Sequence, residues 1–191
     1  FFFPTGHIQT VLLLFMNGIE KSRKFLNYYK YSSTRKIVDA RDGEAIYLDF
    51  SYKSKGIDQH PEDMHNFDFL KSYDNSKILF IVPGACGTGG EFYLTDVMEK
   101  FTQENYKIIA YNHRGVLNYK LKKNKLYHAG YTDDLHDAFN FLNSHIKNSK
   151  YFVLGFSMGG NVVTKFLGES GLKAKDSYNI YGGCSVCGPL D

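Results

Sequence analysis

The chain has few of the residues on which disulfide scaffolds and membrane-spanning segments depend. Its 191 residues include only three cysteines, and an odd, sparse set argues against a disulfide framework and favours a reducing compartment. The apolar run at 11–16 is far shorter than the roughly 20 residues of a membrane-spanning helix, and it lacks the flanks of a signal peptide. Because residue 1 is Phe rather than Met, a membrane anchor ahead of the chain stays open.

The chain also lacks a strong excess of one charge and lacks a linker. Its net charge is +3, so neither a nucleic acid nor an anionic membrane surface is indicated as a partner. With four prolines and no Pro/Gly/Ser linker, residues 1–191 fit a single domain that can bury a core. Cys184 and Cys187 form a C-x-x-C, but no second pair accompanies it, which disfavours a zinc or redox site. We expect neither a metal nor a cofactor.

What the sequence does contain is an alternation of strand-like and helix-like segments. Residues 1–33 are expected to form an N-terminal strap, and 34–191 the sheet and helices. Strand-like runs at 36–40 and 45–52 flank an Asp-Gly hairpin signal, whereas 53–76 is polar and irregular. Further strands are predicted at 78–82, 108–111, 151–154 and 179–186, and helices at 91–101, 131–146 and 161–167. This alternation predicts an α/β fold: a mostly parallel sheet with helices on both faces, preceded by an antiparallel hairpin.

The segment 131–146 gives the clearest helical signal. Its apolar residues fall on one face: Leu135, Ala138, Phe139, Leu142 and Ile146. We expect Thr132 to cap the start of this helix, and the helix dipole favours Asp133 and Asp134 in its first turn.

The most informative segment reads Gly155-Phe156-Ser157-Met158-Gly159, between an apolar strand and a helical stretch. A bare G-x-S-x-G pattern is weakly specific, but between a strand and a helix it describes a nucleophile elbow. In an elbow the serine occupies a strained turn that lifts its Oγ above the sheet, and the glycines make room for neighbouring backbone. Ser157 is therefore the candidate nucleophile; the alternative is an ordinary strand-to-helix turn.

A serine nucleophile also needs N–H donors aimed at the oxygen of the attacked carbonyl. In an elbow one donor is the N–H of the residue after the serine, here Met158. The other comes from the loop after the third strand, which is the glycine-rich segment 83–90. We predict the Ala85 N–H as this donor, with the Cys86 N–H as the runner-up. A phosphate cradle, the other use of such a loop, would end in Gly-Lys-Ser/Thr, which is missing here.

Six motifs, in order along the chain, resemble the YheT-like branch of the α/β-hydrolases, which includes eukaryotic membrane-associated lipases and phospholipases. They are Gly6-His7-Ile8-Gln9-Thr10, Asp42-Gly43, Pro83-Gly84, Asn112-His113-Arg114-Gly115, Tyr127-His128-Ala129-Gly130 with Thr132-Asp133-Asp134-Leu135, and 155–161. The chain departs from the family pattern at Tyr131, where Asp is usual, and at Val116-Leu117, where smaller residues are usual. The resemblance implies an α/β-hydrolase fold and a serine hydrolase acting on carboxylic esters, with lipid-like acyl esters as substrates.

The resemblance also implies that the acid and the histidine of the catalytic triad are not in this chain. In this fold they follow the nucleophile in the order serine, acid, histidine. After Ser157 the only carboxylates are Glu169, Asp176 and Asp191, and there is no histidine. We therefore expect the 191 residues to be roughly the first two-thirds of a domain, inactive alone and marginally stable or aggregating because sheet edge and apolar surface are exposed.

Other conspicuous polar residues are expected to be structural. His113 and His128 precede the serine, so we predict that they stabilise turns rather than act as its base. His7 is likewise predicted to be structural. Arg114 is predicted to pair with a carboxylate of the turn at 133–134.

Two other functions stay open beside hydrolysis. One is a non-catalytic α/β-hydrolase scaffold that binds a lipid or protein partner, which a missing histidine in the intact protein would favour. The other is an acyltransferase that passes the acyl group from Ser157 to an alcohol, which product analysis with an added alcohol would reveal. Localisation stays open between the cytoplasm and a membrane-associated position facing a reducing compartment, attached through a segment outside this chain.

Overall fold

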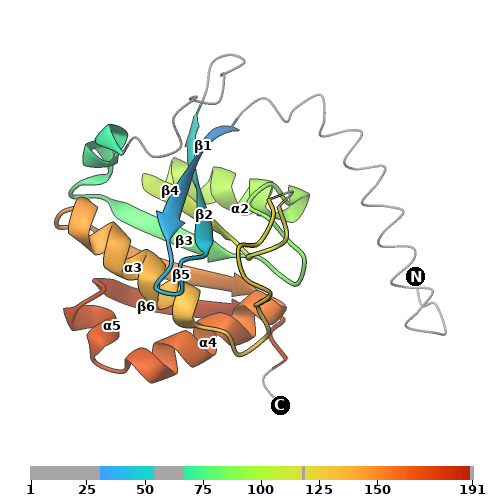
Figure 1. Cartoon of the computed structure of the whole chain (residues 1–191). Coiled ribbons are helices and arrows are strands. Elements are labelled where there is room, and N and C mark those ends of the chain that lie inside the picture. Colours follow the sequence, from blue (N-terminus) through green and yellow to red (C-terminus); the bar gives the residue numbers. More distant parts are fainter. Residues whose placement is uncertain (1–30, 54–66, 118, 190–191) are drawn as a thin grey trace. The chain divides into compact units, whose positions relative to one another are not determined.

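The computed structural model describes residues 31–53, 67–117 and 119–189, in which strands and helices alternate (Figure 1). The elements are β1 (Tyr31–Asp39), β2 (Ala45–Lys53), η2 (Asp68–Tyr73), β3 (Lys77–Val82), α2 (Phe92–Gln103), β4 (Tyr106–Asn112), α3 (Asp133–His145), β5 (Lys150–Phe156), α4 (Met158–Ser170), α5 (Lys173–Asp176) and β6 (Ile180–Val186). None of the helices described here is long and apolar enough to cross a membrane.

Contacts divide the chain into two units. One comprises residues 33–52 and 59–191, and the other comprises residues 1–32 and 53–58. Almost all of the second unit lies outside the described residues, and so does the predicted motif at 6–10. The described strands and helices therefore belong to the first unit, apart from residues 31, 32 and 53, and the prediction of a single domain over 1–191 stays a prediction.

The strands of the described chain form one sheet in the order β1-β2-β4-β3-β5-β6. β2 runs antiparallel to β4, whereas β4, β3, β5 and β6 run parallel to one another. The predicted hairpin joins β1 to β2, and its turn is closed by N–H groups of Ala40 and Gly43 that donate to the carbonyls of Glu44 and Ala40, each at 2.8 Å. Gly43 has a φ of +81°, which glycine adopts without strain. The predicted fold class is confirmed.

Alternate residues of the central strand face opposite sides of the sheet and define two cores. On one side Ile78, Phe80 and Val82 of β3 pack with side chains of α3 and α4. On the other side Leu79 and Ile81 pack with side chains of α2. Helices therefore cover both faces (Figure 1), which is why β3 is apolar at successive positions rather than at alternate ones.

Two segments differ most from the predictions, the end of the expected strap and the region before β3. β1 begins at Tyr31, so residues 31–33 are strand and not the end of a strap; the rest of the predicted strap lies outside the described residues. Within the segment predicted to be irregular, η2 is a 3₁₀ helix that buries Leu70 and Tyr73. Two buried residues three positions apart satisfy one turn of such a helix, but they are too few to produce a periodic signal.

Thr132 precedes α3 as predicted, but its side chain does not cap the helix. A capping side chain reaches the first-turn N–H groups from an extended backbone. The backbone of Thr132 is already helical, with φ −112° and ψ −12°, and its Oγ1 donates to Glu169 Oε2 at 2.5 Å instead. The predicted cap was therefore wrong. The predicted apolar face is confirmed, because these residues are buried: Leu135, Ala138, Phe139, Leu142 and Ile146.

Candidate active site

Ser157 lies between the last residue of β5 and the first residue of α4. Its backbone has φ +51° and ψ −123°, outside the regions that L-residues favour. Neighbouring elements hold this conformation: the Ser157 N–H donates to the Val186 carbonyl, and the Ser157 carbonyl accepts from the Gly160 N–H, both at 2.8 Å. The residue is exposed at the carboxyl end of the strand. The turn therefore presents a serine to solvent at a cost in backbone strain.

Gly155 and Gly159 leave room for backbone that passes close to the elbow. A methyl group on Gly155 would clash with the Gly159 carbonyl, and one on Gly159 would clash with the Pro83 carbonyl. The loop after β3 also lies against the serine, since a Cβ on Gly84 would be 3.4 Å from the Ser157 Cβ. The predicted close approach of neighbouring backbone at these glycines is confirmed.

Replacing Gly159 should separate these two backbone segments. We expect Gly159→Ala to lower the free energy of unfolding by about 2 kcal/mol or more, because carbonyls on the adjoining strand must move. Gly168→Ala is the matched control in the same helix, where a Cβ meets nothing within 4 Å. Alanine is favoured there over glycine by about 0.5–1 kcal/mol. Urea denaturation measures both effects, and equal stability of the two variants would contradict the close approach.

In the loop after β3, one N–H group finds no hydrogen-bond acceptor in the described part of the chain. Every other N–H group of residues 84–90 donates to an oxygen atom: Gly84 to Tyr93 Oη (3.3 Å), Cys86 to Tyr127 Oη (2.9 Å), Gly87 to the Gly84 carbonyl (3.0 Å), Thr88 to Glu91 Oε1 (3.4 Å), Gly89 to Asn112 Oδ1 (2.9 Å) and Gly90 to Thr88 Oγ1 (3.2 Å). The Ala85 N–H has no acceptor among the described residues, and Ala85 is exposed. Cys86, the second predicted donor, already donates to Tyr127.

A second N–H group without an acceptor among the described residues, that of Met158, follows the serine directly. Met158 is the first residue of α4, and the N–H groups of a first helical turn have no acceptor within the helix. The helix dipole adds positive potential at the same end. The two segments that adjoin Ser157 thus each offer an N–H group, one from Ala85 and one from Met158.

His113 follows β4 and holds the loop after β3. Its Nε2 donates to the Pro83 carbonyl at 3.0 Å, and its ring stacks on Tyr127 with the centroids 4.3 Å apart. Burial lowers the pKa of His113, so the ring is neutral at pH 7, and it must carry its proton on Nε2 because a carbonyl only accepts. Asn112, one residue earlier, accepts from the Gly89 N–H near the other end of the loop. The prediction that His113 stabilises a turn is confirmed.

Arg114 forms the buried ion pair predicted for it. It is 1% exposed, and its guanidinium donates to both carboxylate oxygens of Asp134, through Nε at 2.9 Å and through Nη2. Its Nη1 donates to Asp42 Oδ2 in the hairpin turn at 2.8 Å, and this hydrogen bond lowers the pKa of Asp42. The Tyr111 hydroxyl also donates to Asp134, at 3.0 Å. The network joins the hairpin, the end of β4 and the start of α3.

Tyr131 stands where the resembling family usually has Asp. The Arg114 Cζ lies 4.8 Å from the centroid of its ring, and the Lys125 Nζ lies 4.6 Å from that centroid. Cations are attracted to the face of an aromatic ring. The departure from the family pattern therefore leaves Arg114 with a favourable partner at this position.

The other described histidines bond away from the elbow. Their hydrogen bonds are His128 Nδ1 with the Gly130 N–H (3.2 Å), His136 Nδ1 with the Tyr178 hydroxyl (3.0 Å) and His145 Nδ1 with the Ser144 hydroxyl (2.8 Å). No histidine in the part of the chain that the structure describes hydrogen-bonds to Ser157 Oγ. His7 lies outside the described residues.

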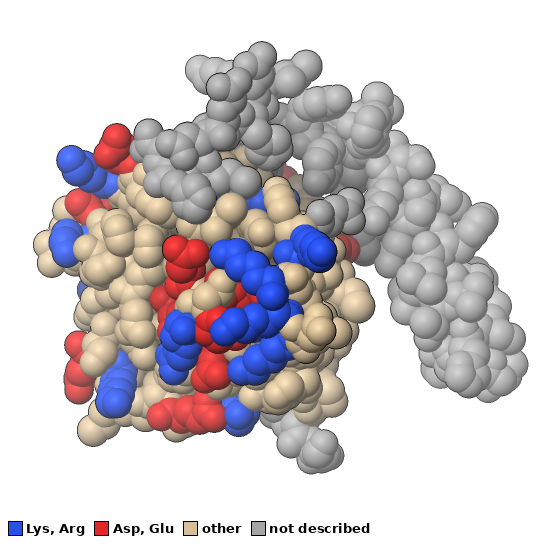
Figure 2. Space-filling model, viewed as in Figure 1, with Lys and Arg blue, Asp and Glu red and all other residues tan. Residues whose placement is uncertain are grey.

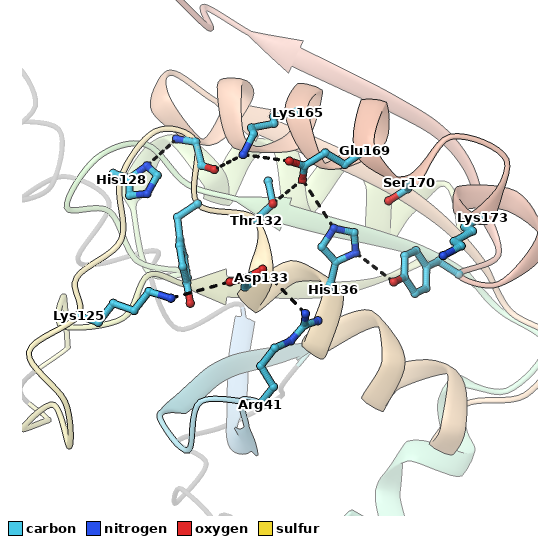
Figure 3. Close-up of a pocket in the computed structure, with 13 residues that line it drawn as sticks. Arg41, Lys125, His128, Thr132, Asp133, His136, Lys165, Glu169, Ser170 and Lys173 are labelled. Atoms are coloured by element: carbon cyan, nitrogen blue, oxygen red, sulfur yellow. Dashed lines mark hydrogen bonds and ion pairs between the residues drawn. The ribbon is translucent and has the colours of Figure 1, made fainter.

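A polar pocket of about 660 Å³ lies beside α3 and α4 (Figure 3). Within it Glu169 accepts from Thr132 and forms a 2.9 Å ion pair with Lys165. Basic and acidic side chains are interspersed on this face of the molecule, so no large area carries one sign of charge (Figure 2). Ser157 is not among the residues that line the pocket. The pocket is therefore separate from the candidate site at the elbow.

The cysteines are free in the described chain. Cys86, Cys184 and Cys187 are all exposed thiols. Across the described residues, no group of three or more His, Cys, Asp or Glu side chains is arranged to hold a metal ion.

Known proteins resemble this chain in sequence. A family model described as serine aminopeptidase, S33, matches residues 73–180, more than half of the chain. The chain is 24% identical to the monoacylglycerol lipase of Saccharomyces cerevisiae, over 97% of this chain and 44% of that protein. It is 26% identical to monoacylglycerol lipase ABHD2 of Danio rerio, over 87% of this chain and 34% of that protein. The chain thus spans less than half the length of these two curated relatives.

Solved structures share the fold. The esterase Pf2001 of Pyrococcus furiosus matches with a TM-score of 0.56 at 15% sequence identity. The match covers 84% of this chain and 53% of the esterase chain. At this identity the likeness supports the arrangement of strands and helices alone.

Proposed function

The chain belongs to the α/β-hydrolase family described as serine aminopeptidase, S33, and on that premise we propose that it carries the nucleophile and oxyanion hole of a serine ester hydrolase. The observation that carries the proposal is the conformation of Ser157, an exposed serine held at positive φ between β5 and α4. The protein tolerates such strain where it serves a function. The N–H groups of Ala85 and Met158, which have no acceptor among the described residues, belong to the two segments that adjoin this serine and support the proposal.

In the proposed first step Ser157 Oγ attacks the carbonyl carbon of the ester. A general base takes the serine proton, and we assign that role to a histidine outside the described residues. The carbonyl oxygen becomes negatively charged, and the N–H groups of Ala85 and Met158 donate to it. One such donor typically contributes about 100- to 1000-fold to kcat. The helix dipole of α4 adds to this stabilisation because its positive end faces the same oxygen.

In the second step the tetrahedral species collapses and the bond to the alcohol oxygen breaks. The protonated base returns its proton to the leaving alcohol, and the acyl group stays on Ser157 as an ester. Water then attacks this acyl-serine by the same route and releases the carboxylic acid. The exposed position of Ser157 gives both the substrate and the water access to the acyl carbon.

We propose lipid acyl esters as the substrate class. Three relatives carry the name monoacylglycerol lipase, and they align with 97%, 87% and 87% of this chain. Release of fatty acid from a monoacylglycerol by the intact protein is the expected result. Cleavage of an aminoacyl anilide with no action on acyl esters would contradict this substrate class and favour a peptidase.

Labelling with a fluorophosphonate tests the nucleophile directly. We expect the intact protein to form a covalent adduct on Ser157, because a serine activated by a base attacks the phosphorus of such a probe. Ser157→Ala should abolish the label. Ser144→Ala, which removes an exposed serine of α3, should leave it unchanged. No labelling of the unaltered protein, or labelling that persists in Ser157→Ala, would sink the proposal and favour a scaffold.

A further inference from the structure

The peptide that joins Pro83 to Gly84 is held from two sides by side chains distant in the sequence. Its carbonyl accepts from His113 Nε2 at 3.0 Å, and its N–H donates to the Tyr93 hydroxyl at 3.3 Å. His113 is 2% exposed and follows β4, whereas Tyr93 belongs to α2. Two other elements of the fold therefore fix the orientation of this peptide, and the loop's own backbone does not.

The peptide that joins Ala85 to Cys86 is held in a similar way. The Cys86 N–H donates to the Tyr127 hydroxyl at 2.9 Å, and the Tyr127 ring is stacked on His113 at an interplanar angle of 15°. Cys86 has a φ of +57°, a left-handed conformation that costs a residue with a side chain about 1–2 kcal/mol. We expect the loop to leave this conformation when the hydroxyl that accepts from Cys86 is removed.

Ala85 lies between these two held peptides, and its N–H is the one that the loop leaves free. An oxyanion donor is effective only when it already points at the developing charge. A misplacement of about 1 Å in catalytic geometry costs about 100-fold in rate. We propose that His113 and Tyr127 are positioning residues that hold the loop 83–90 so that the Ala85 N–H faces the oxygen of the attacked carbonyl. This inference rests on the function proposed above.

A general base is the competing role for His113. Its Nε2 proton is already donated to the Pro83 carbonyl, and its ring lies between a stacked Tyr127 and an edge-on Tyr111. Substitution separates the two roles. A glutamine side chain supplies an N–H donor in place of Nε2, but it is not a base at neutral pH. His113→Gln therefore preserves the hydrogen bond to the loop and removes any base.

The test measures two quantities on the intact protein. Amide hydrogen exchange of residues 83–90, followed by mass spectrometry, reports how firmly the loop is held. Steady-state kinetics with a short-chain ester reports catalysis. The variants are Tyr127→Phe, which removes one oxygen and keeps the stacked ring, His113→Leu and His113→Gln. Tyr106→Phe is the matched control, because Tyr106 lies at the opposite end of β4.

We expect Tyr127→Phe to speed amide exchange in the loop and to lower kcat about 10-fold with KM within about twofold, because only the transition state uses the donor. His113→Leu should lower kcat about 100-fold. His113→Gln should recover most of the kcat that His113→Leu loses, and it should keep the pH dependence of kcat/KM. Across the variants, the affinity for a boronic acid transition-state analogue should fall in parallel with kcat. Tyr106→Phe should change neither exchange nor kinetics.

Two results would overturn the positioning role. One is exchange and kcat at the unaltered level in both Tyr127→Phe and His113→Leu. The other is an inactive His113→Gln variant with a protected loop, which would assign His113 as the base. Amide exchange can be measured whether or not the protein is an active enzyme, so a failure of the proposed function is distinguishable from a failure of the positioning role. If the unaltered protein takes no fluorophosphonate label, the hydrolase is refuted, and with it the catalytic use of the Ala85 N–H.

Discussion

Ser157→Ala is expected to lower kcat/KM for ester substrates by about 10⁴-fold or more, because the acyl intermediate can no longer form. KM should change little, since the side chain that is removed attacks the substrate and does not bind it. The variant should remain folded, because alanine keeps the Cβ and adds no atom to the elbow. Steady-state kinetics and circular dichroism on the intact protein measure the two effects.

Ser157→Gly is the companion variant that separates function from strain. Glycine adopts φ +51° and ψ −123° more readily than serine, so the free energy of unfolding of the Ser157→Gly variant should rise by about 1 kcal/mol. Its catalytic loss should equal that of the alanine variant. A glycine variant less stable than the alanine variant would mean that the turn stores no strain. An alanine variant with ordinary activity would exclude Ser157 as the nucleophile.

Arg114→Leu is expected to have the largest effect on stability, about 3–5 kcal/mol of unfolding free energy. The guanidinium is 1% exposed and donates to both oxygens of Asp134 and to Asp42. Removing it leaves the buried carboxylate of Asp134 with the Tyr111 hydroxyl as its one remaining donor among the described residues. A buried charge without its partner lowers stability by far more than the intact pair adds, because nothing then offsets the cost of removing that charge from water.

Arg41→Leu is the matched control for this ion pair. Arg41 pairs with Asp137 at 2.8 Å, but its side chain is 54% exposed, and exposed ion pairs contribute about 1 kcal/mol or less. The double variant Arg114→Leu with Asp134→Leu should recover part of the loss, since it removes both buried charges. Urea denaturation gives all three values. A similar cost for Arg114→Leu and Arg41→Leu would contradict the importance of burial at this network.

The strands, the three longest helices (α2, α3 and α4) and the elbow were predictable because each leaves a local signal. β3 is buried on both faces, so five successive apolar residues mark it. The elbow is marked by Gly155 and Gly159, where neighbouring backbone leaves no room for a side chain. The partner of Arg114 was predictable from a motif that brings the first turn of α3 near the end of β4. Sequence patterns thus predict features that depend on residues close together in the sequence.

The contacts that hold the loop after β3 were not predictable in this way. Tyr127 is 41 positions from Cys86, and no periodicity or spacing links a hydroxyl to a distant N–H. His113 was expected to stabilise a turn, but the sequence gives no sign that its acceptor is the Pro83 carbonyl. Thr132 was misassigned for a related reason. Its hydroxyl donates to Glu169, which is 37 positions away in the sequence, and that contact exists only in the folded chain.

Trapping the acyl-enzyme would show directly whether Ser157 is the nucleophile. The intact protein is mixed with a slowly hydrolysed short-chain ester, quenched in acid during turnover, and digested for peptide mass spectrometry. We expect an acyl group on the peptide that contains Ser157, absent in Ser157→Ala and diminished in Tyr127→Phe. Turnover with the acyl group on another residue, or with no covalent adduct at any time, would contradict this expectation.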